Sequence, residues 1–361
     1  MQRHKSLNKT VFPYLRSQCY ITEYQKYARS FICQLIIILM IDINSSHSSQ
    51  VSDDCYRRRI AYCSKVFRII LRLSGIILIV VQIVKLFEAE SLFSWDFTSH
   101  FLTLILGGLI LVASLPAVTN KAVTRFASRI HNRKFAIYTY IFPLLFTCLL
   151  LLVKIQLGPD SDRWDAMGKE GGLSEYGTAI AYLLMTIFAL PMTKQFWRQG
   201  QKILATLYGL LTFASFFVSM EEISWGQRLI GFEEPKYWAE NNAQSEFTFH
   251  NLSFYQEHLL NESFIVVGLI GSFCWLLLAY WQKQQRQQRS KIDLNYILPN
   301  WTISSYFYPT LIFYIIHVFT DGLGFFITND QEHCEFIMSM GILLFVLINF
   351  FRQAKENSLA R

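Results

Sequence analysis

Residues 136–156 read AIYTYIFPLLFTCLLLLVKIQ, and Lys154 is the single charged side chain in this run. A helix needs about 20 mostly apolar residues to cross the hydrocarbon core of a bilayer, because each residue rises about 1.5 Å through a layer about 30 Å thick. The run meets this requirement and therefore predicts a transmembrane helix.

Apolar segments of similar length recur through most of the chain. Of its 361 residues, 52% are hydrophobic and 16% are charged, and the mean hydropathy of +0.28 is higher than that of most soluble chains. The sequence therefore predicts an all-α, polytopic membrane helix bundle of about eight transmembrane helices, with a long outer loop, residues 221–262, between the fifth and the sixth. The predicted spans are 69–87, 101–118, 136–156, 176–192, 203–220, 263–281, 303–319 and 336–351.

The charges of the connecting loops alternate along the chain. Lys and Arg gather after the second, fourth and sixth spans and at the C-terminus, as at Lys121, Arg125 and Arg129. Asp and Glu predominate after the first, third, fifth and seventh spans. Because cytoplasmic loops have an excess of Lys and Arg, this alternation predicts a multi-pass protein of the cell membrane, with both termini in the cytoplasm and the acidic loops outside.

Residues 1–65 are predicted to form an N-terminal cytoplasmic extension that precedes the bundle, residues 66–361. The apolar run Phe31–Ile41 is about half the length of a span and predicts an interfacial helix. The seven Cys include no C-x-x-C pair, so neither a zinc ribbon nor a disulfide framework is indicated. The net charge of +7 reflects Lys and Arg confined to particular loops, which argues against nucleic-acid binding.

The strongest local pattern follows the fifth predicted span and reads EEISWGQR from Glu221 to Arg228. If the helix continues, Glu221, Trp225 and Arg228 share one face. Two adjacent carboxylates at membrane depth are costly, so we expect Glu221 and Glu222 to meet water, a cation or Arg228. The pattern therefore suggests acid/base chemistry, and the alternative is a cap at the membrane interface that pairs with Arg228.

The same loop contains an alternating pattern, NAQSEFTFHN, over residues 242–251. Glu246 and His250 are candidates for a metal site or an acid/base pair, and the alternative is a solvated lid over the helix ends. The alternation predicts an extended segment with one polar face, formed by Asn242, Gln244, Glu246, Thr248 and His250.

Two further groups of residues lie on the predicted outer side. His317 and Asp321 share one face near the end of the seventh span, and a His inside a membrane suggests function, although it can also bond a neighbouring helix. Glu175 stands at the entrance of the fourth span, where capping alone also explains an acid. If all these groups converge, they form an outward-facing acidic pocket suited to acid/base or metal-assisted chemistry, or to a cation.

Parts of the chain resemble a group of uncharacterised bacterial polytopic membrane proteins. The resemblance covers about residues 160–260 and implies a polytopic fold without a known activity. A looser similarity exists to the ceramidase-related membrane hydrolases, whose H-x-x-x-H pair is absent here because His317 is followed four residues later by Asp321. The motifs that resemble the first group are Glu221–Arg228, Asn242-x-Gln244-x-Glu246, His250-Asn251, Glu170-Gly171-Gly172 and Glu175-Tyr176.

The leading hypothesis from the sequence is a membrane-embedded enzyme that acts on a lipid or lipid-linked substrate at the extracytoplasmic face. Its expected partners are the lipid bilayer and that substrate, and no nucleic acid. The candidate catalytic residues are Glu221, Glu222, Glu246, His250, His317 and Asp321. The candidate substrate-orienting residues are Glu175, Trp225, Gln227, Arg228, Asn242 and Gln244.

Two other classes of function remain open from the sequence. A transporter or channel for a cation or small solute is disfavoured, because few polar residues are predicted at mid-membrane depth and no pair of broken helices is predicted in the two halves. A non-catalytic scaffold or sensor would use the outer loop to bind a partner. No pattern identifies a cofactor, a metal or an oligomeric state.

Overall fold

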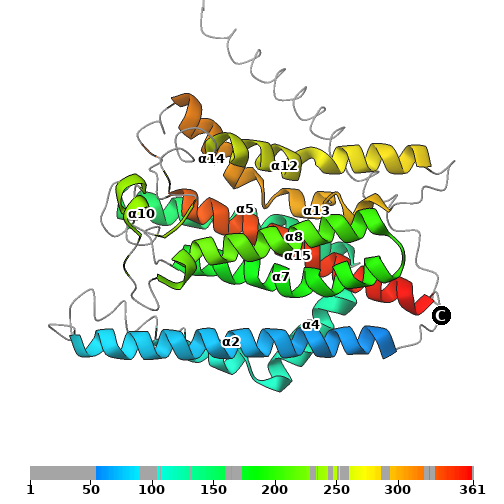
Figure 1. The fold of residues 1–361 in the computed structure, drawn as a ribbon, viewed down its shortest axis with the longest axis horizontal. Coiled ribbons are helices and arrows are strands. Elements are labelled where there is room, and N and C mark those ends of the chain that lie inside the picture. Colours follow the sequence, from blue (N-terminus) through cyan, green and yellow to red (C-terminus); the bar gives the residue numbers. More distant parts are fainter. Residues whose placement is uncertain are drawn as a thin grey trace, which may run out of the picture. The chain divides into compact units, whose positions relative to one another are not determined.

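The structure, a computed structural model, consists of helices joined by short turns and loops (Figure 1). It describes residues 54–88, 104–105, 107–130, 132–158, 164, 173–227, 233, 235–242, 247–249, 252, 260–285, 293–320, 325 and 330–359. The β-pairing in this part of the chain is one isolated bridge between Asn242 and Leu252. The predicted all-α fold is therefore confirmed, whereas the apolar run Phe31–Ile41 lies outside the described residues.

The helices are named in chain order. The chain divides into two compact units, Met1–Val51 and Ser52–Arg361, and the described residues belong to the second. The predicted domain boundary at residue 65 falls inside the first helix. The elements are α2 (Asp54–Glu88), α4 (Pro116–Arg129), α5 (Arg133–Leu157), α7 (Leu173–Arg198), α8 (Lys202–Glu222), η1 (Ser224–Gly226), α10 (Lys236–Asn241), α12 (Leu260–Gln285), η2 (Leu294–Tyr296), α13 (Trp301–Ser304), α14 (Tyr308–Thr320) and α15 (Asp330–Leu359).

Several helices are long and apolar enough to cross a membrane, as predicted. The described residues contain five such helices. Two bent helix pairs are also present, and if each pair counts as one span the total is seven. The first predicted span, 69–87, lies within the continuous helix α2, which is not among these seven. The five helices are Arg133–Leu157, Ser174–Arg198, Lys202–Glu222, Leu260–Trp281 and Asp330–Glu356.

Two predicted spans are bent rather than straight. Gly107–Ala113 and Pro116–Arg129 meet at 71°, and Leu294–Ser304 and Tyr308–Thr320 meet at 75°. The first bend has a clear cause, because a residue before proline avoids helical geometry and Leu115 is extended, with ψ of 140°. The prediction that broken helices do not recur in the two halves of the chain is therefore wrong.

The basic stretch after the second predicted span is also helical. We predicted a loop that contains Lys121, Arg125 and Arg129, but all three lie on α4, because Pro116 starts a new helix.

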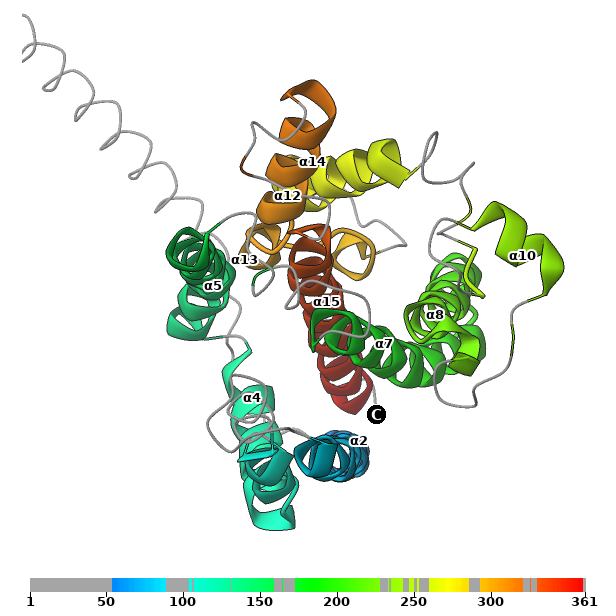
Figure 2. The ribbon, with the colours of Figure 1, turned by 90° about the vertical axis from the view of Figure 1, so that its left-hand side faces the viewer.

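Helix α15 lies at the centre of the bundle and packs against α7, α14, α13 and α2 (Figure 2). In its apolar window 61% of the residues are buried, compared with 11% in α5, which therefore lies at the periphery. The largest core cluster joins α7, α8 and α15, where Met185, Phe188 and Phe350 are almost fully buried. Outward-facing apolar side chains on α5, α8 and α12, such as Leu145 and Phe213, suit contact with lipid.

Candidate functional site

The predicted outer end of the bundle is the end at which α7 and α15 begin and α8 and α14 finish (Figure 1, left). The helix ends that flank the acidic loops of the sequence lie at this end. It contains two polar groups of residues, one built from carboxylates and one from a buried ion pair and a serine–histidine contact.

The carboxylate cluster comprises Glu175 on α7, Glu221 and Glu222 at the end of α8, and Glu332 and Glu335 on α15. The charges of the four other carboxylates all act on Glu222, and those of Glu332 and Glu175 act on Glu335. Glu175, Glu221 and Glu222 are buried, and Glu332 and Glu335 are partly buried. Acids from three separate helices therefore interact electrostatically in an apolar bundle, and they include the predicted Glu175, Glu221 and Glu222.

Two tyrosines on neighbouring helices adjoin this cluster. The Tyr314 hydroxyl donates to Glu335 Oε1 over 2.9 Å, and its ring stacks on Phe264 with centroids 4.6 Å apart. The charges of Glu222 and Glu335 also act on Tyr182 of α7. Because Tyr314 is fully buried, its hydroxyl holds the Glu335 carboxylate in a fixed orientation.

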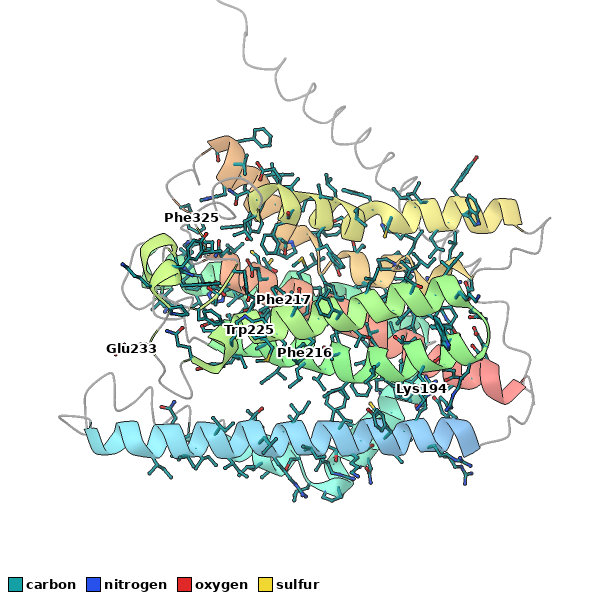
Figure 3. The ribbon with its side chains drawn as sticks, viewed as in Figure 1. Lys194, Phe216, Phe217, Trp225, Glu233 and Phe325 are labelled. Atoms are coloured by element: carbon teal, nitrogen blue, oxygen red, sulfur yellow. The ribbon has the colours of Figure 1, made fainter. Side chains whose placement is uncertain are left out.

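Glu221 ties the outer loop to the end of α8. Its Oε1 accepts from the Trp225 indole N–H, and its Oε2 accepts from the Phe249 amide N–H over 2.6 Å. The Phe217 ring packs edge-to-face on Trp225, with centroids 5.6 Å apart (Figure 3). Glu221 thus holds a segment 28 residues further along the chain.

The backbone between Glu221 and Trp225 differs from the continuing helix that we considered. Helix α8 stops at Glu222, and Ser224, Trp225 and Gly226 all have positive φ, at 48°, 52° and 83°. The left-handed conformation costs about 1–2 kcal/mol for each non-glycine residue. The contact between Trp225 and Glu221 therefore arises from a left-handed turn and not from the spacing of a helix.

Other loop residues hold the same segment in place. Gln227 Oε1 accepts from the Phe247 N–H over 2.6 Å, and the Asn242 side-chain amide donates to the Thr248 carbonyl over 3.1 Å. The Trp238 indole donates to that carbonyl too, over 3.2 Å. Gln227 and Asn242 thus position the described segment at Phe247 and Thr248. Arg228, Gln244, Glu246, His250 and Asp321 lie outside the described residues.

The second polar group begins with a charged pair that links α5 to α15. Lys154 Nζ donates to Asp330 Oδ2, both side chains are almost fully buried, and the Trp164 indole donates to Asp330 Oδ1 over 2.8 Å. The Lys154 ammonium also lies 4.9 Å from the centre of the Phe325 ring. The sequence patterns did not predict this pair, although a lone Lys in an apolar run pointed to it.

A serine–histidine contact adjoins this ion pair. Ser174 Oγ lies 2.7 Å from His333 Nδ1, and the Trp164 ring packs against His333 with centroids 5.1 Å apart. The charges of Asp330 and Lys154 both act on His333. Neither Ser174 nor His333 was predicted, because Ser174 is an unremarkable helix-start residue and His333 belongs to no motif.

No described interaction joins His317 to the carboxylate cluster. Its ring stacks on Phe313, with centroids 5.7 Å apart, and its buried Nδ1 has no hydrogen-bond partner among the described residues. It is not among the groups whose charges act on Glu222 or Glu335. In the described part of the chain, His, Cys, Asp and Glu form no group of three that could hold a metal ion.

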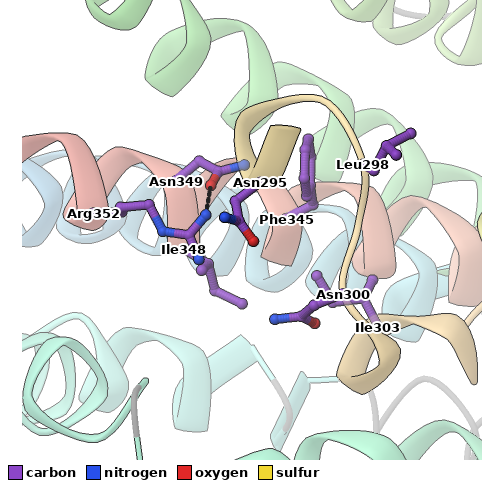
Figure 4. A pocket seen from close by; sticks show the side chains of 8 residues that line it. All are labelled: Asn295, Leu298, Asn300, Ile303, Phe345, Ile348, Asn349 and Arg352. Carbon is purple, nitrogen blue, oxygen red and sulfur yellow. Dashed lines mark hydrogen bonds between the residues drawn. The ribbon is translucent and has the colours of Figure 1, made fainter. Parts of the chain in front are cut away.

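A small pocket lies far from this end, beside the C-terminal half of α15 (Figure 4). Arg352 donates to Asn349 within it over 3.2 Å. The pocket has room for about one water molecule. It is therefore too small for a substrate. Its lining residues are Asn295, Leu298, Asn300, Ile303, Phe345, Ile348, Asn349 and Arg352.

Comparisons with protein-family models, with curated proteins and with solved structures gave no match.

Proposed function

We propose that this chain is a membrane-embedded enzyme that acts from the extracytoplasmic face on a lipid or lipid-linked substrate. The observation that supports the proposal is the electrostatic effect of Glu335 on Glu222, two carboxylates that come from α15 and α8. When two carboxylates lie close together, one tends to keep its proton while the other is ionised. Catalysis by an acid and a base together requires such a pair.

Glu335 has a hydrogen-bond donor of its own. Tyr314 donates to Glu335 and holds its carboxylate in a fixed orientation. We assign Glu222 and Glu335 together to proton transfer at this site. Glu221 has a different role, because both of its oxygens already accept hydrogen bonds from Trp225 and Phe249.

The surroundings of the cluster favour a substrate that arrives through the lipid. Tyr176 follows Glu175 on α7 and is 39% exposed, and Phe216, six residues before Glu222 on α8, is 44% exposed. Exposed aromatic rings on a membrane-spanning helix face acyl chains or headgroups. These rings therefore suit contact with lipid beside the two helices that contribute Glu175 and Glu222.

The direct test is turnover of lipids by the purified protein. Proteoliposomes made from the lipid extract of the producing cells are incubated and analysed by mass spectrometry. We expect wild-type protein to convert one lipid class, and Glu222→Gln and Glu335→Gln to lower the rate by roughly 10²–10⁴-fold, the usual contribution of a general acid or base.

The matched control is Glu262→Gln, which changes an exposed carboxylate in the first turn of α12 at the same end of the bundle. It should convert lipid at the wild-type rate. Unchanged lipids with the wild-type protein, or full turnover by folded Glu222→Gln and Glu335→Gln protein, would rule out this proposal.

One observation favours transport as a second candidate. Broken spans in both halves of a chain are typical of transporters, and two bent pairs are present here. However, α4 packs on α2, whereas α13 and α14 pack on α5, α12 and α15, so the two breaks adjoin different helices. Glu222-dependent flux of a cation or proton into the same proteoliposomes, without any change in lipid, would favour this candidate.

A further inference from the structure

We infer that Ser174 is the nucleophile of this site and His333 its general base, and that the substrate is a carboxylic ester of a lipid. This inference rests on the proposed function, to which it adds the reaction class. The carboxylates alone leave the reaction open, whereas a hydroxyl bonded to an imidazole is the arrangement that activates serine for acyl transfer.

The first support is the distance between the two side chains. Ser174 Oγ and His333 Nδ1 lie 2.7 Å apart, within the reach of a base that removes a hydroxyl proton. Gly177 allows α7 to approach α15 here, since a Cβ at this position would lie 2.6 Å from the Phe336 ring. The contact thus depends on a close approach of two helices one turn below Ser174.

The second support is the Nε2 atom of the His333 ring. His333 is only 7% exposed, and its buried Nε2 has no hydrogen-bond partner among the described residues. An unsatisfied buried polar group costs about 1–3 kcal/mol. A purely structural serine–histidine bond does not account for this cost.

The third support is the electrostatic setting. When His333 takes the hydroxyl proton it becomes a cation, and the charges of Asp330 and Lys154 both act on it. Lys154 and Asp330 pair with each other, so the two opposite charges lie together beside His333. Ser174 is the second residue of α7, and the free N–H groups of a helix N-terminus stabilise an oxyanion.

The reaction then proceeds in two balanced halves. Ser174 Oγ forms a bond to the ester carbonyl carbon while its proton passes to His333 Nδ1. The bond from that carbon to the alcohol oxygen breaks, and the alcohol leaves with the proton. Water then repeats the sequence on the acyl-serine, which releases a fatty acid and restores both side chains.

A covalent probe tests the inference without knowledge of the natural lipid. A fluorophosphonate with a long alkyl chain reacts with an activated serine, because Oγ bonds to phosphorus and fluoride leaves. We expect the probe to modify the peptide that contains Ser174 in wild-type protein, and Ser174→Ala to abolish this labelling. His333→Asn places an amide near the position of Nδ1 without a base, and should lower labelling by roughly 10²–10⁴-fold.

Ser219→Ala is the matched control, because Ser219 is another buried serine at this end of the bundle and its hydroxyl donates to the Ala179 carbonyl over 2.9 Å. The probe should label the Ser219→Ala variant to the same extent as the wild type. Absence of label on Ser174, or full labelling of His333→Asn protein that elutes as a folded species, overturns the inference. Lipid turnover that needs Glu222 but survives Ser174→Ala would overturn this inference alone and leave the proposed function intact.

Discussion

Lys154 on α5 forms a buried ion pair with Asp330, the first residue of α15, and Trp164 donates to the second Asp330 oxygen over 2.8 Å. This pair fixes the start of α15 beside the peripheral helix α5. His333, three residues further along, packs against the same Trp164 ring, so the ion pair also supports the serine–histidine contact.

Breaking the ion pair from one side should strongly destabilise the protein. Lys154→Met or Asp330→Asn leaves one buried partner uncompensated, at a cost of about 3–5 kcal/mol. The double variant should cost clearly less than the sum of the two single variants, because it leaves neither charge behind. Thermal unfolding in detergent measures this, and additive losses of melting temperature would contradict the pairing.

Releasing Glu221 should loosen the outer loop. Glu221→Ala removes the acceptor of the Trp225 and Phe249 N–H groups, and hydrogen bonds to charged groups contribute about 1.5–3 kcal/mol. Proteolysis between α8 and α12 should therefore become roughly tenfold faster or more, since cleavage follows the open population. Glu262→Ala is the control, and equal cleavage of the two variants would show that Glu221 does not hold the loop.

A methyl group added at Gly271 should destabilise the packing of α12. A Cβ there would lie 2.2 Å from ring atoms of Phe307, and overpacking of this kind costs about 1–3 kcal/mol. Gly108→Ala is the matched control, because nothing lies within 4 Å of its Cβ position. We expect a lower melting temperature for Gly271→Ala alone. Equal melting temperatures would mean that α12 does not approach Phe307 this closely.

Cys63 should resist thiol reagents in the folded protein. It is buried in the cluster formed by α2, α7 and α15, and burial raises the pKa of its thiol to about 12, so little thiolate exists at pH 7.5. Maleimide labelling followed by mass spectrometry should find Cys63 unmodified until the protein is denatured. Ala61→Cys, at an exposed position two residues away, should react readily. Rapid modification of native Cys63 would contradict the packing of α2 on this core.

The helical architecture could largely be predicted from the sequence. Apolar runs such as 136–156 predict spans directly, because crossing the bilayer sets their length. The bends were missed, since hydropathy averages over a window and does not register that Pro116 forces Leu115 out of helical geometry. The same averaging hid the fact that the basic residues after Pro116 continue a helix.

The candidate site could be predicted only in part. Glu175, Glu221 and Glu222 stood out because acids at span ends are unusual. Glu335 and Ser174 did not, because their roles depend on how α15 packs against α7, and one sequence does not specify which helix faces meet. The contacts of the central helix are therefore what structure added to the sequence.

The electrostatic effect of Glu335 on Glu222 requires the end of α8 to lie near the start of α15, and cysteine cross-linking measures this proximity. Glu222→Cys with Glu335→Cys should be joined by a short bifunctional thiol reagent in membranes, in a Cys334→Ala background that removes the adjacent native thiol. Glu222→Cys with Lys355→Cys is the control, since Lys355 lies 20 residues further along α15, about 30 Å at 1.5 Å per residue. Efficient cross-linking of the first pair alone is the predicted result, and no cross-link in it, or equal cross-linking in both pairs, would contradict the account.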